Sequence, residues 1–229
     1  MKHIIVSIFV LFFLTPTLTG KKYKFEFITV SDIVKRVKKK FSEIESYQAN
    51  FIITTTKLES KSNQSGLVMY KAPSKIRIEF YVPYGQKVIS NGQTMWIYIP
   101  SMNVVAEQDL KSDNNSLFLT GTKSGLNRLF QKYHYKFASK KQPNEQSDGT
   151  MNYTLILKQR ESRSGFRNLK LWIDENYIIT QAHGETSTGK SVKIQLANIK
   201  TDVDITNGKF HFDIPSKARI IKNPIISEE

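Results

Sequence analysis

The sequence predicts a mainly β protein, built as one large curved antiparallel sheet or open barrel with a covering of short helices. From Tyr47 onward, apolar and polar residues alternate with the period of two that a half-buried strand requires. Turn-forming residues separate these runs, and long helices do not alternate with them as they would in a parallel βαβ fold. We therefore expect about eleven strands in a single domain, residues 21–229.

The composition excludes several classes of protein. The chain has 229 residues, with 34 Lys and Arg against 20 Asp and Glu, and no cysteine. Without cysteine there is no disulfide, no thiolate metal site, no catalytic thiol and no lipidated cysteine. The net charge of +14 is compatible with an acidic partner, such as nucleic acid or an anionic membrane, but also with an AT-biased genome.

The first twenty residues predict export from the cytoplasm. A short basic start precedes an apolar run, Ile4 to Leu14, which suits a signal peptide and is too short to span a bilayer. Pro16 ends this run, and Gly20 is a small residue at a suitable cleavage point. We interpret residues 1–20 as a signal peptide and expect a periplasmic protein, for which nucleic acid is an unsuitable partner.

An amphipathic helix is predicted next. Ser31 is a suitable N-cap, and Asp32 places an acidic side chain in the first turn. Apolar residues then recur at spacings of three and four up to Ile44, and the basic run Lys35 to Lys40 falls mostly on the opposite face. We expect this basic face to be solvated, with docking on anionic lipid or an acidic receptor as the alternative.

The predicted strands fall into two groups, separated by a helical segment. Between Asp113 and Tyr133 we expect two short helical pieces hinged at Gly121 and Gly125. The expected strands are 49–55, 66–70, 75–80, 87–90 and 94–99 before this segment, and 133–138, 153–158, 168–174, 178–184, 190–199 and 209–214 after it. The expected turns and loop are 62–65, 72–74, 83–85, 91–92 and 139–150.

No motif for catalysis or metal binding occurs in the sequence. The histidines are isolated, and the chain has neither a G-x-S-x-G elbow nor a phosphate-binding glycine loop. Glu43 and Glu45 would point to different sides of a helix, and Asp202 and Asp204 lie in a turn-like segment, so neither pair suits a glycosidase. We therefore expect neither an enzyme nor a cofactor.

The apolar alternation of the strands points instead to lipid. A wide sheet with only a few short helices leaves apolar surface uncovered, and a concave apolar surface in an exported protein suits acyl chains. Each CH₂ group removed from water contributes about 0.8 kcal/mol. Such a site needs few hydrogen bonds, in agreement with the missing catalytic motifs.

Three motifs along the predicted strands are specific when taken together. They are Tyr47-Gln48-Ala49-Asn50-Phe51, the run Gly66 to Ile78 around Ala72-Pro73-Ser74, and Asn91-Gly92-Gln93-Thr94-Met95-Trp96-Ile97-Tyr98. With a closing segment, Phe210 to Pro215, they resemble the outer-membrane lipoprotein carrier protein family, LolA. The resemblance covers most of residues 31–216, in the family's order.

This resemblance implies an unclosed antiparallel β-barrel with helical lids, acting as a monomeric periplasmic carrier without a cofactor. Such a carrier takes acylated lipoproteins from an inner-membrane ATP-binding-cassette transporter and delivers them to the outer membrane, with an outer-membrane receptor as a further candidate partner. The chain departs from the family at two points. The family's arginine before the motif proline is Ala72, so the lid must be held differently, and its aromatic pair after that proline is Ile76 and Ile78.

Two sets of site residues follow from the resemblance and from the alternation. The lipid-facing set is Phe51, Met69, Ile76, Ile78, Phe80, Trp96, Tyr98 and Leu171. The lid set is Leu117, Phe118, Leu126 and Phe130. Ordinary core packing is the alternative for each of these residues, and Trp96 and Tyr98 also suit a structural role in their strand.

Two further functions stay open on the same physical grounds. The first is a carrier of free lipid or glycolipid. The second is a lipid-sensing domain that regulates an envelope stress response through a partner protein. Sensors of this kind usually carry a second domain, and we expect only a short tail after Pro215, which argues against a sensor.

Overall fold

The computed structural model describes residues 28–110, 123–147, 149–161 and 165–223. Its two α-helices are α1 (Val30–Glu43) and α2 (Lys123–Lys132), and two 3₁₀ helices are η1 (Pro100–Met102) and η3 (Asn207–Phe210). The strands are β1 (Ser46–Lys57), β2 (Ser60–Lys71), β3 (Lys75–Val82), β4 (Lys87–Ser90), β5 (Thr94–Ile99), β6 (Val104–Asp109), β7 (Tyr133–Phe137), β8 (Asn144–Glu145), β9 (Met151–Gln159), β10 (Phe166–Ile173), β11 (Ile179–Thr186), β12 (Ser191–Thr201) and β13 (Arg219–Lys222).

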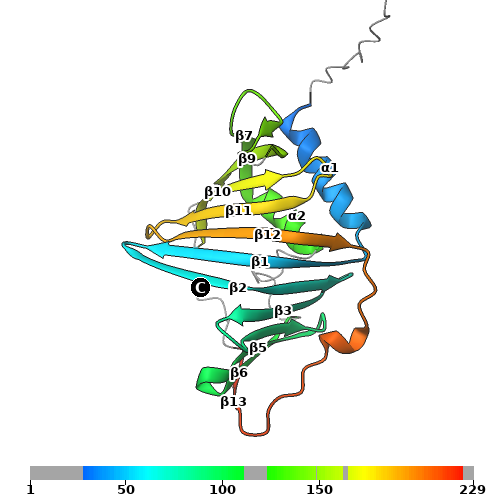
Figure 1. The fold of residues 1–229 in the computed structure, drawn as a ribbon, viewed down its shortest axis with the longest axis vertical. Helices are drawn as coiled ribbons and strands as arrows, with labels where there is room; N and C mark the ends of the chain where they lie inside the picture. The colour runs from blue at the N-terminus through cyan, green and yellow to red at the C-terminus, as the bar shows by residue number, and fades with distance from the viewer. Residues whose placement is uncertain (1–27, 111–122, 148, 162–164, 224–229) are drawn as a thin grey trace, which may run out of the picture.

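The strands form one open, twisted 13-stranded sheet (Figure 1). Its order is β13-β6-β5-β4-β3-β2-β1-β12-β11-β10-β9-β7, and β8 pairs with β9 beside this path. The pairs are antiparallel except β13 with β6, which is parallel. Because β13 and β7 are the two ends of the order, the sheet is unclosed, and the predicted fold class is confirmed.

The central pairing of the sheet joins β1 and β12, two strands that are far apart in the sequence. Phe51 of β1 lies opposite Gly66 of β2, its neighbour in sequence, and opposite Leu196 of β12, far away in sequence. On each side the pairing then runs mostly between strands that are adjacent in the chain, as expected for a meander.

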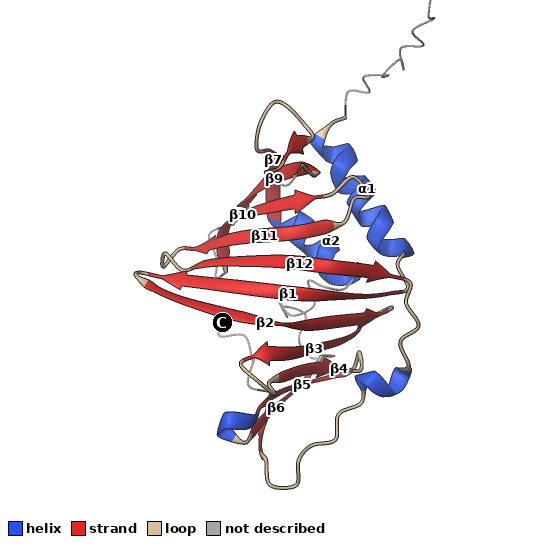
Figure 2. Ribbon diagram, in the orientation of Figure 1, coloured by secondary structure: helices blue, strands red, loops and turns tan. Residues whose placement is uncertain are grey.

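The sheet has two faces, which we call inner and outer. The inner face carries α1 and α2, and Figure 2 shows α2 behind strands β10 to β12. On this face, side chains that share a level of the register continue from strand to strand, as in Leu155, Leu171, Ala182 and Ile194. The outer face carries the intervening residues of each strand, because successive side chains of a strand point to opposite sides.

The main core lies between the helices and one half of the inner face. Ile33, Val34 and Val37 of α1 pack there with Leu126 and Phe130 of α2. Their partners on the sheet are buried residues of β7, β9 and β10, namely Tyr133, Tyr153, Leu155, Leu157, Leu169, Leu171 and Ile173. The spacing of the α1 residues fits one buried helical stripe, as the sequence predicts.

The N-cap of α1 is Thr29, and the prediction of Ser31 is wrong. The Thr29 hydroxyl accepts a hydrogen bond from the Asp32 amide at 3.2 Å, and the Thr29 amide donates to Asp32 Oδ2 at 3.0 Å. This reciprocal capping box satisfies two backbone donors that Ser31, two residues further on, would leave unpaired. The hydrogen bond from the Thr29 side chain, followed by that from the Thr29 backbone, lowers the pKa of Asp32.

Two of the basic residues of α1 pack on aromatic rings, contrary to the expected solvated stripe. Arg36 Nη1 donates to the Tyr177 hydroxyl at 2.6 Å, and the guanidinium carbon lies 5.4 Å from the centre of that ring. Lys38 Nζ lies 5.7 Å from the centre of the Phe130 ring on α2. Lys35 and Lys39 are exposed, as predicted. Cation–π contact therefore ties α1 both to the β10–β11 turn and to α2.

The turn of the β1–β2 hairpin lies earlier in the sequence than predicted. The predicted turn at 62–65 lies inside β2, and the chain reverses at Leu58, which has a φ of 53° and is 91% exposed. The Thr54 hydroxyl donates to Asn63 Oδ1 across the ladder at 3.0 Å. Because the tip of the hairpin projects into solvent, its strands need no apolar alternation, and the polar run resembles a turn.

The C-terminal strand also differs from the prediction. Residues 209–214 are not a strand: the chain forms η3 and then runs across the outer face without pairing. Instead β13 pairs with β6, and neither of these strands was predicted. All four side chains of β13 are exposed, so the alternation that marks a half-buried strand is missing from its sequence.

The predicted hinge at Gly125 is wrong as well, because Gly125 lies within the continuous helix α2. Gly121 and the first of the two predicted helical pieces lie outside the described residues, as does the predicted signal peptide, 1–20. The predicted loop at 139–150 is confirmed over its described residues, 139–147 and 149–150, except for the two residues of β8.

A pair of alanine variants tests the cap of α1. We expect Thr29→Ala to lower the free energy of unfolding by about 1 kcal/mol, because it removes the hydroxyl that accepts from the Asp32 amide. Ser31→Ala is the control and should leave stability within about 0.5 kcal/mol of wild type. Urea unfolding followed by circular dichroism measures both. Equal losses in the two variants would contradict the capping box.

Candidate functional site

The second half of the inner face carries a row of apolar side chains on β12, β1, β2 and β3. We call this row the β1–β3 patch. It consists of Ala49, Phe51, Ile53, Val68, Ile76, Ile78, Phe80 and Leu196. The register brings them together: Phe51 lies opposite Leu196, and Val68 opposite Ile78. Phe51 and Ile76 are buried, whereas Ile53, Ile78, Phe80 and Leu196 are half-buried.

In the described residues the helices cover one half of the inner face and reach the other half through Phe41 of α1, which packs on Tyr47 and Tyr70. The main core combines α1 and α2 with β7, β9 and β10. In the described part of the chain, the cluster that forms the patch contains strand residues alone. The inner face therefore changes, at β12 and β1, from a helix-covered core to a sheet surface of aliphatic and aromatic side chains.

Gly66 creates space for the central aromatic residue of the patch. A Cβ atom added to Gly66 would lie 2.8 Å from the Phe51 ring and would collide with the Glu79 carbonyl oxygen. Phe51 instead packs across this glycine and meets Phe80 edge to face, with ring centres 5.3 Å apart. The glycine of the second sequence motif is thus required by the Phe of the first.

Three aromatic rings connect α1 to the end of the patch. Tyr47 and Tyr70 stack with ring centres 5.2 Å apart, and Phe41 of α1 lies 5.9 Å from each of them. The Tyr70 hydroxyl donates to the Pro73 carbonyl at 3.1 Å. Burial, and to a lesser degree the neighbouring Tyr70, raises the pKa of Tyr47 well above its ordinary value. This cluster fixes the last turn of α1 against β1 and β2.

The predicted lipid-facing residues separate into three groups. Phe51, Ile76, Ile78 and Phe80 lie together on the patch. Leu171 is on the inner face too, but it is buried beneath the helices. The other three lie on the outer face and do not join the patch: Met69, Trp96 and Tyr98.

Strand alternation explains why Met69, Trp96 and Tyr98 lie on the outer face. On β2 the inner residues are Gly66, Val68 and Tyr70, so Met69 points outward. On β5, Met95 and Ile97 continue the inner face, so Trp96 points outward, as Tyr98 does. Sequence reasoning placed Gly66 and Tyr70 on one strand but did not extend their parity to Val68. The predicted set also lacks three other patch residues, Ala49, Ile53 and Leu196.

The C-terminal segment, residues 203–215, covers these three residues on the outer face. Met69 packs with Ile205 and Phe210. The ring of Phe212 lies 6.3 Å from that of Trp96 and 5.9 Å from that of Tyr98. Trp96 Nε1 also donates to Glu107 Oε2 at 3.1 Å. This geometry fits the alternative considered for Trp96 and Tyr98, in which they pack as structural residues of their strand.

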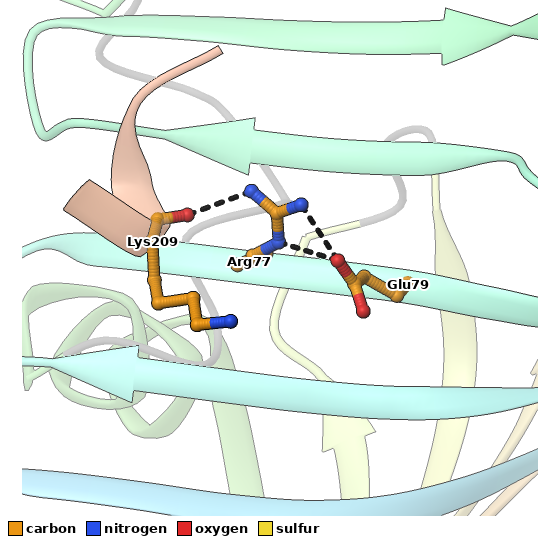
Figure 3. Close-up of polar contacts among 3 residues, drawn as sticks. All are labelled: Arg77, Glu79 and Lys209. Carbon is orange, nitrogen blue, oxygen red and sulfur yellow. Dashed lines mark hydrogen bonds and ion pairs between the residues drawn. The ribbon is translucent and has the colours of Figure 1, made fainter. Parts of the chain in front are cut away.

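Basic side chains of β2 and β3 anchor the C-terminal segment. Figure 3 shows Arg77, whose Nη1 donates to the Lys209 carbonyl at 2.8 Å and whose Nε donates to Glu79 Oε1 at 2.7 Å. Lys75 Nζ donates to Asn207 Oδ1 at 3.0 Å, and Lys71 Nζ to the Ile205 carbonyl at 2.6 Å. Lys71 therefore points away from the helices and does not replace the family's arginine at Ala72.

Of the predicted lid residues, the structure places two. Leu126 and Phe130 of α2 are 5% and 3% exposed and pack against α1 and the sheet. Leu117 and Phe118 lie outside the described residues.

Other kinds of site find no support in the described ranges. These residues hold no group of three or more metal-binding side chains and no helix long and apolar enough to cross a membrane. The depressions of this surface include one of about 390 Å³, lined by Gln48, Asn50 and Leu67 with residues 198–200, and one of about 320 Å³, lined by polar residues of β5, β6 and β13 with Gln93 and Asn223. Neither is lined by a predicted site residue.

The fold agrees with what similar proteins show. The sequence profile of the family "Outer membrane lipoprotein carrier protein LolA" matches residues 42–213. The chain belongs to this family, which is one of non-enzymatic transport proteins. The match contains β1, β2, β3 and β12, which carry the patch. It also contains residues 203–213 of the C-terminal segment.

Relatives with established family names are distant in sequence. The outer-membrane lipoprotein carrier protein of Francisella tularensis is 26% identical over 204 residues, which is 85% of this chain and 90% of the relative. That of Haemophilus influenzae is 26% identical over 188 residues, 81% and 84% of the two chains. An uncharacterized Methanocaldococcus jannaschii protein is 21% identical over 200 residues, and the match spans only 55% of its length.

Solved structures share the fold at low identity. An uncharacterized conserved protein from Thermus thermophilus superposes with a TM-score of 0.56 at 13% identity, covering 84% of this chain and 98% of that one. MucB superposes with a TM-score of 0.51 at 14% identity, covering 83% of this chain and 64% of MucB. These likenesses concern the fold alone.

Tyr47, which is half-buried in the aromatic cluster, makes stability depend on pH. The folded state favours the neutral Tyr47 hydroxyl, so its contribution is present below the ordinary pKa of 10.0 and is lost as the pH rises above it. We expect Tyr47→Phe to show a smaller loss of stability than wild type between about pH 9 and 11. Tyr84→Phe, at a position that is 90% exposed, should keep the wild-type slope. Denaturant unfolding at each pH measures the difference.

Proposed function

We propose that this protein is a periplasmic carrier of acylated lipoproteins and that their acyl chains lie on the β1–β3 patch. The observation that carries the proposal is the patch itself, a row of apolar side chains with no described helix residue in its cluster. The protein belongs to a family of lipoprotein carriers, and the acyl chains of a lipoprotein are apolar like the patch.

The energetics suit an acyl chain. A segment of ten CH₂ groups transferred from water to such a surface would gain about 8 kcal/mol before the entropy of ordering is subtracted. No polar partner is needed, and the half-buried residues Ile53, Ile78 and Phe80 supply the contact area. Aliphatic residues at 76 and 78 lack the directional preferences of aromatic rings, so the surface suits flexible chains.

Export, transfer and delivery complete the proposal. Residues 1–20 direct the chain to the periplasm, where the family typically acts. An inner-membrane ATP-binding-cassette transporter supplies the lipoprotein, and the outer membrane, with or without a receptor, accepts it. A carrier of free lipid or glycolipid would use the same patch and is the second candidate. The likeness to MucB concerns the fold and does not favour a sensor.

Co-purification distinguishes the two candidates. The exported protein is isolated without detergent and analysed by native mass spectrometry, and we expect an acylated lipoprotein bound to it. Recovery of phospholipid or glycolipid alone would favour the second candidate. Protein that stays empty after expression in the periplasm of a lipoprotein-producing host would overturn both.

Two charge substitutions on the two faces locate the cargo. Ile78→Glu places a carboxylate on the patch, and we expect bound acyl cargo to fall at least tenfold, because burying that charge is unfavourable. Ile52→Glu is the matched control, since Ile52 is next to Phe51 but 51% exposed on the outer face. Both variants must show wild-type unfolding midpoints within a few degrees. Equal retention of cargo in both would remove the patch as the binding surface.

A further inference from the structure

The outer face of β7 and β9 to β12 carries a row of basic side chains at one level of the register. Lys136 of β7 lies opposite Ile156 of β9, which lies opposite Lys170 of β10. Lys170 lies opposite His183 of β11, and His183 opposite Lys193 of β12. Since neighbouring strands are about 4.8 Å apart, this basic row extends over about 19 Å.

The charge of this face is nearly uncompensated. The five strands contain a single acidic residue, Glu185, which lies opposite Asn168 and Ser191 at the next level. Lys158 adds a further positive charge beside the row, opposite His134. No ion pair observed in the described residues involves Lys136, Lys158, Lys170 or Lys193.

Apolar and aromatic groups lie among these lysines. Trp172 is half-buried one level from the row, with Lys170 Nζ 4.6 Å from the centre of its ring. Ile156 is half-buried within the row itself. Tryptophan and lysine side chains together on one surface are characteristic of the boundary between water and lipid headgroups.

We propose that the basic row docks the protein peripherally on a bilayer of anionic phospholipids. Its charges are lysines, which bind many headgroups as point charges, and not the paired forks of arginine that recognise particular carboxylates. The row extends across five strands. None of its residues lines either of the depressions of about 390 and 320 Å³. An extended lateral array of this kind matches a headgroup surface better than a defined protein epitope.

Docking through the outer face leaves the inner face accessible. The helices and the β1–β3 patch lie on the other side of the sheet from the basic row. The C-terminal segment covers the outer face only near β2, β3 and β5, so it does not cover the row. The proposed membrane contact is therefore separate from cargo binding and does not depend on it.

Sedimentation with vesicles tests the proposal in the absence of lipoprotein. Each lysine near an anionic surface strengthens binding about fivefold at low salt. We expect binding to phosphatidylglycerol-containing vesicles, little binding to pure phosphatidylcholine, and weaker binding as salt increases. The variant K136Q/K170Q/K193Q should bind about 100-fold more weakly. The control K35Q/K39Q/K217Q removes the same charge from exposed positions elsewhere and should bind as its wild-type parent does, within about fivefold.

Tryptophan emission locates the contact. The chain has two tryptophans, so Trp96→Phe leaves Trp172 as the single reporter. We expect its emission to shift to the blue on anionic vesicles and to be quenched by brominated lipid. Equal weakening by both lysine triples, or binding with unchanged Trp172 emission, would overturn the proposed surface. Absence of vesicle binding, with retention on poly-glutamate that K136Q/K170Q/K193Q abolishes, would replace the bilayer with an acidic protein partner.

Discussion

The pairing of β1 with β12 is the interaction on which the rest of the structure depends. It joins a strand from the start of the described chain to one near its end, and so unites two meanders in one sheet. Its register sets Phe51 beside Leu196 and Ile53 beside Ile194, which makes the inner face continuous across the junction. A shift by one residue would move every inner-face side chain of β1 to the outer face.

The two faces of this sheet are covered in opposite halves. The helices pack on the inner face over β7, β9 and β10, whereas the C-terminal segment packs on the outer face over β2, β3 and β5. Arg77 and Lys71 donate to backbone carbonyls of that segment, and its side chains Ile205, Phe210 and Phe212 add apolar packing. What this arrangement leaves is an apolar patch on one side of the sheet and a basic row on the other.

The substitution of the family's arginine by Ala72 changes how the helices are held. The Ala72 amide donates to the Glu45 carbonyl at 2.8 Å, and the neighbouring Lys71 serves the outer face. For α1, Arg36 on Tyr177 near the middle of the helix and Phe41 on the stacked tyrosines in its last turn supply the attachment. The arginine that holds α1 is thus Arg36, and not a residue at position 72 as the family resemblance suggested. The aromatic rings that hold it are Phe41, Tyr47 and Tyr70.

The sequence by itself determined the fold class, most strand positions and the family, because period-two alternation and turn residues act locally and need no partner strand. It also assigned Phe51, Ile76, Ile78 and Phe80 to one surface, and the structure brings these four together on the patch. Only the tertiary structure decided which apolar set of a strand faces which side, as Met69, Trp96 and Tyr98 demonstrate. The C-terminal segment packs over the outer face of β2 and β5, so these strands carry apolar side chains on both faces, and only the pairing with neighbouring strands assigns each set to its face.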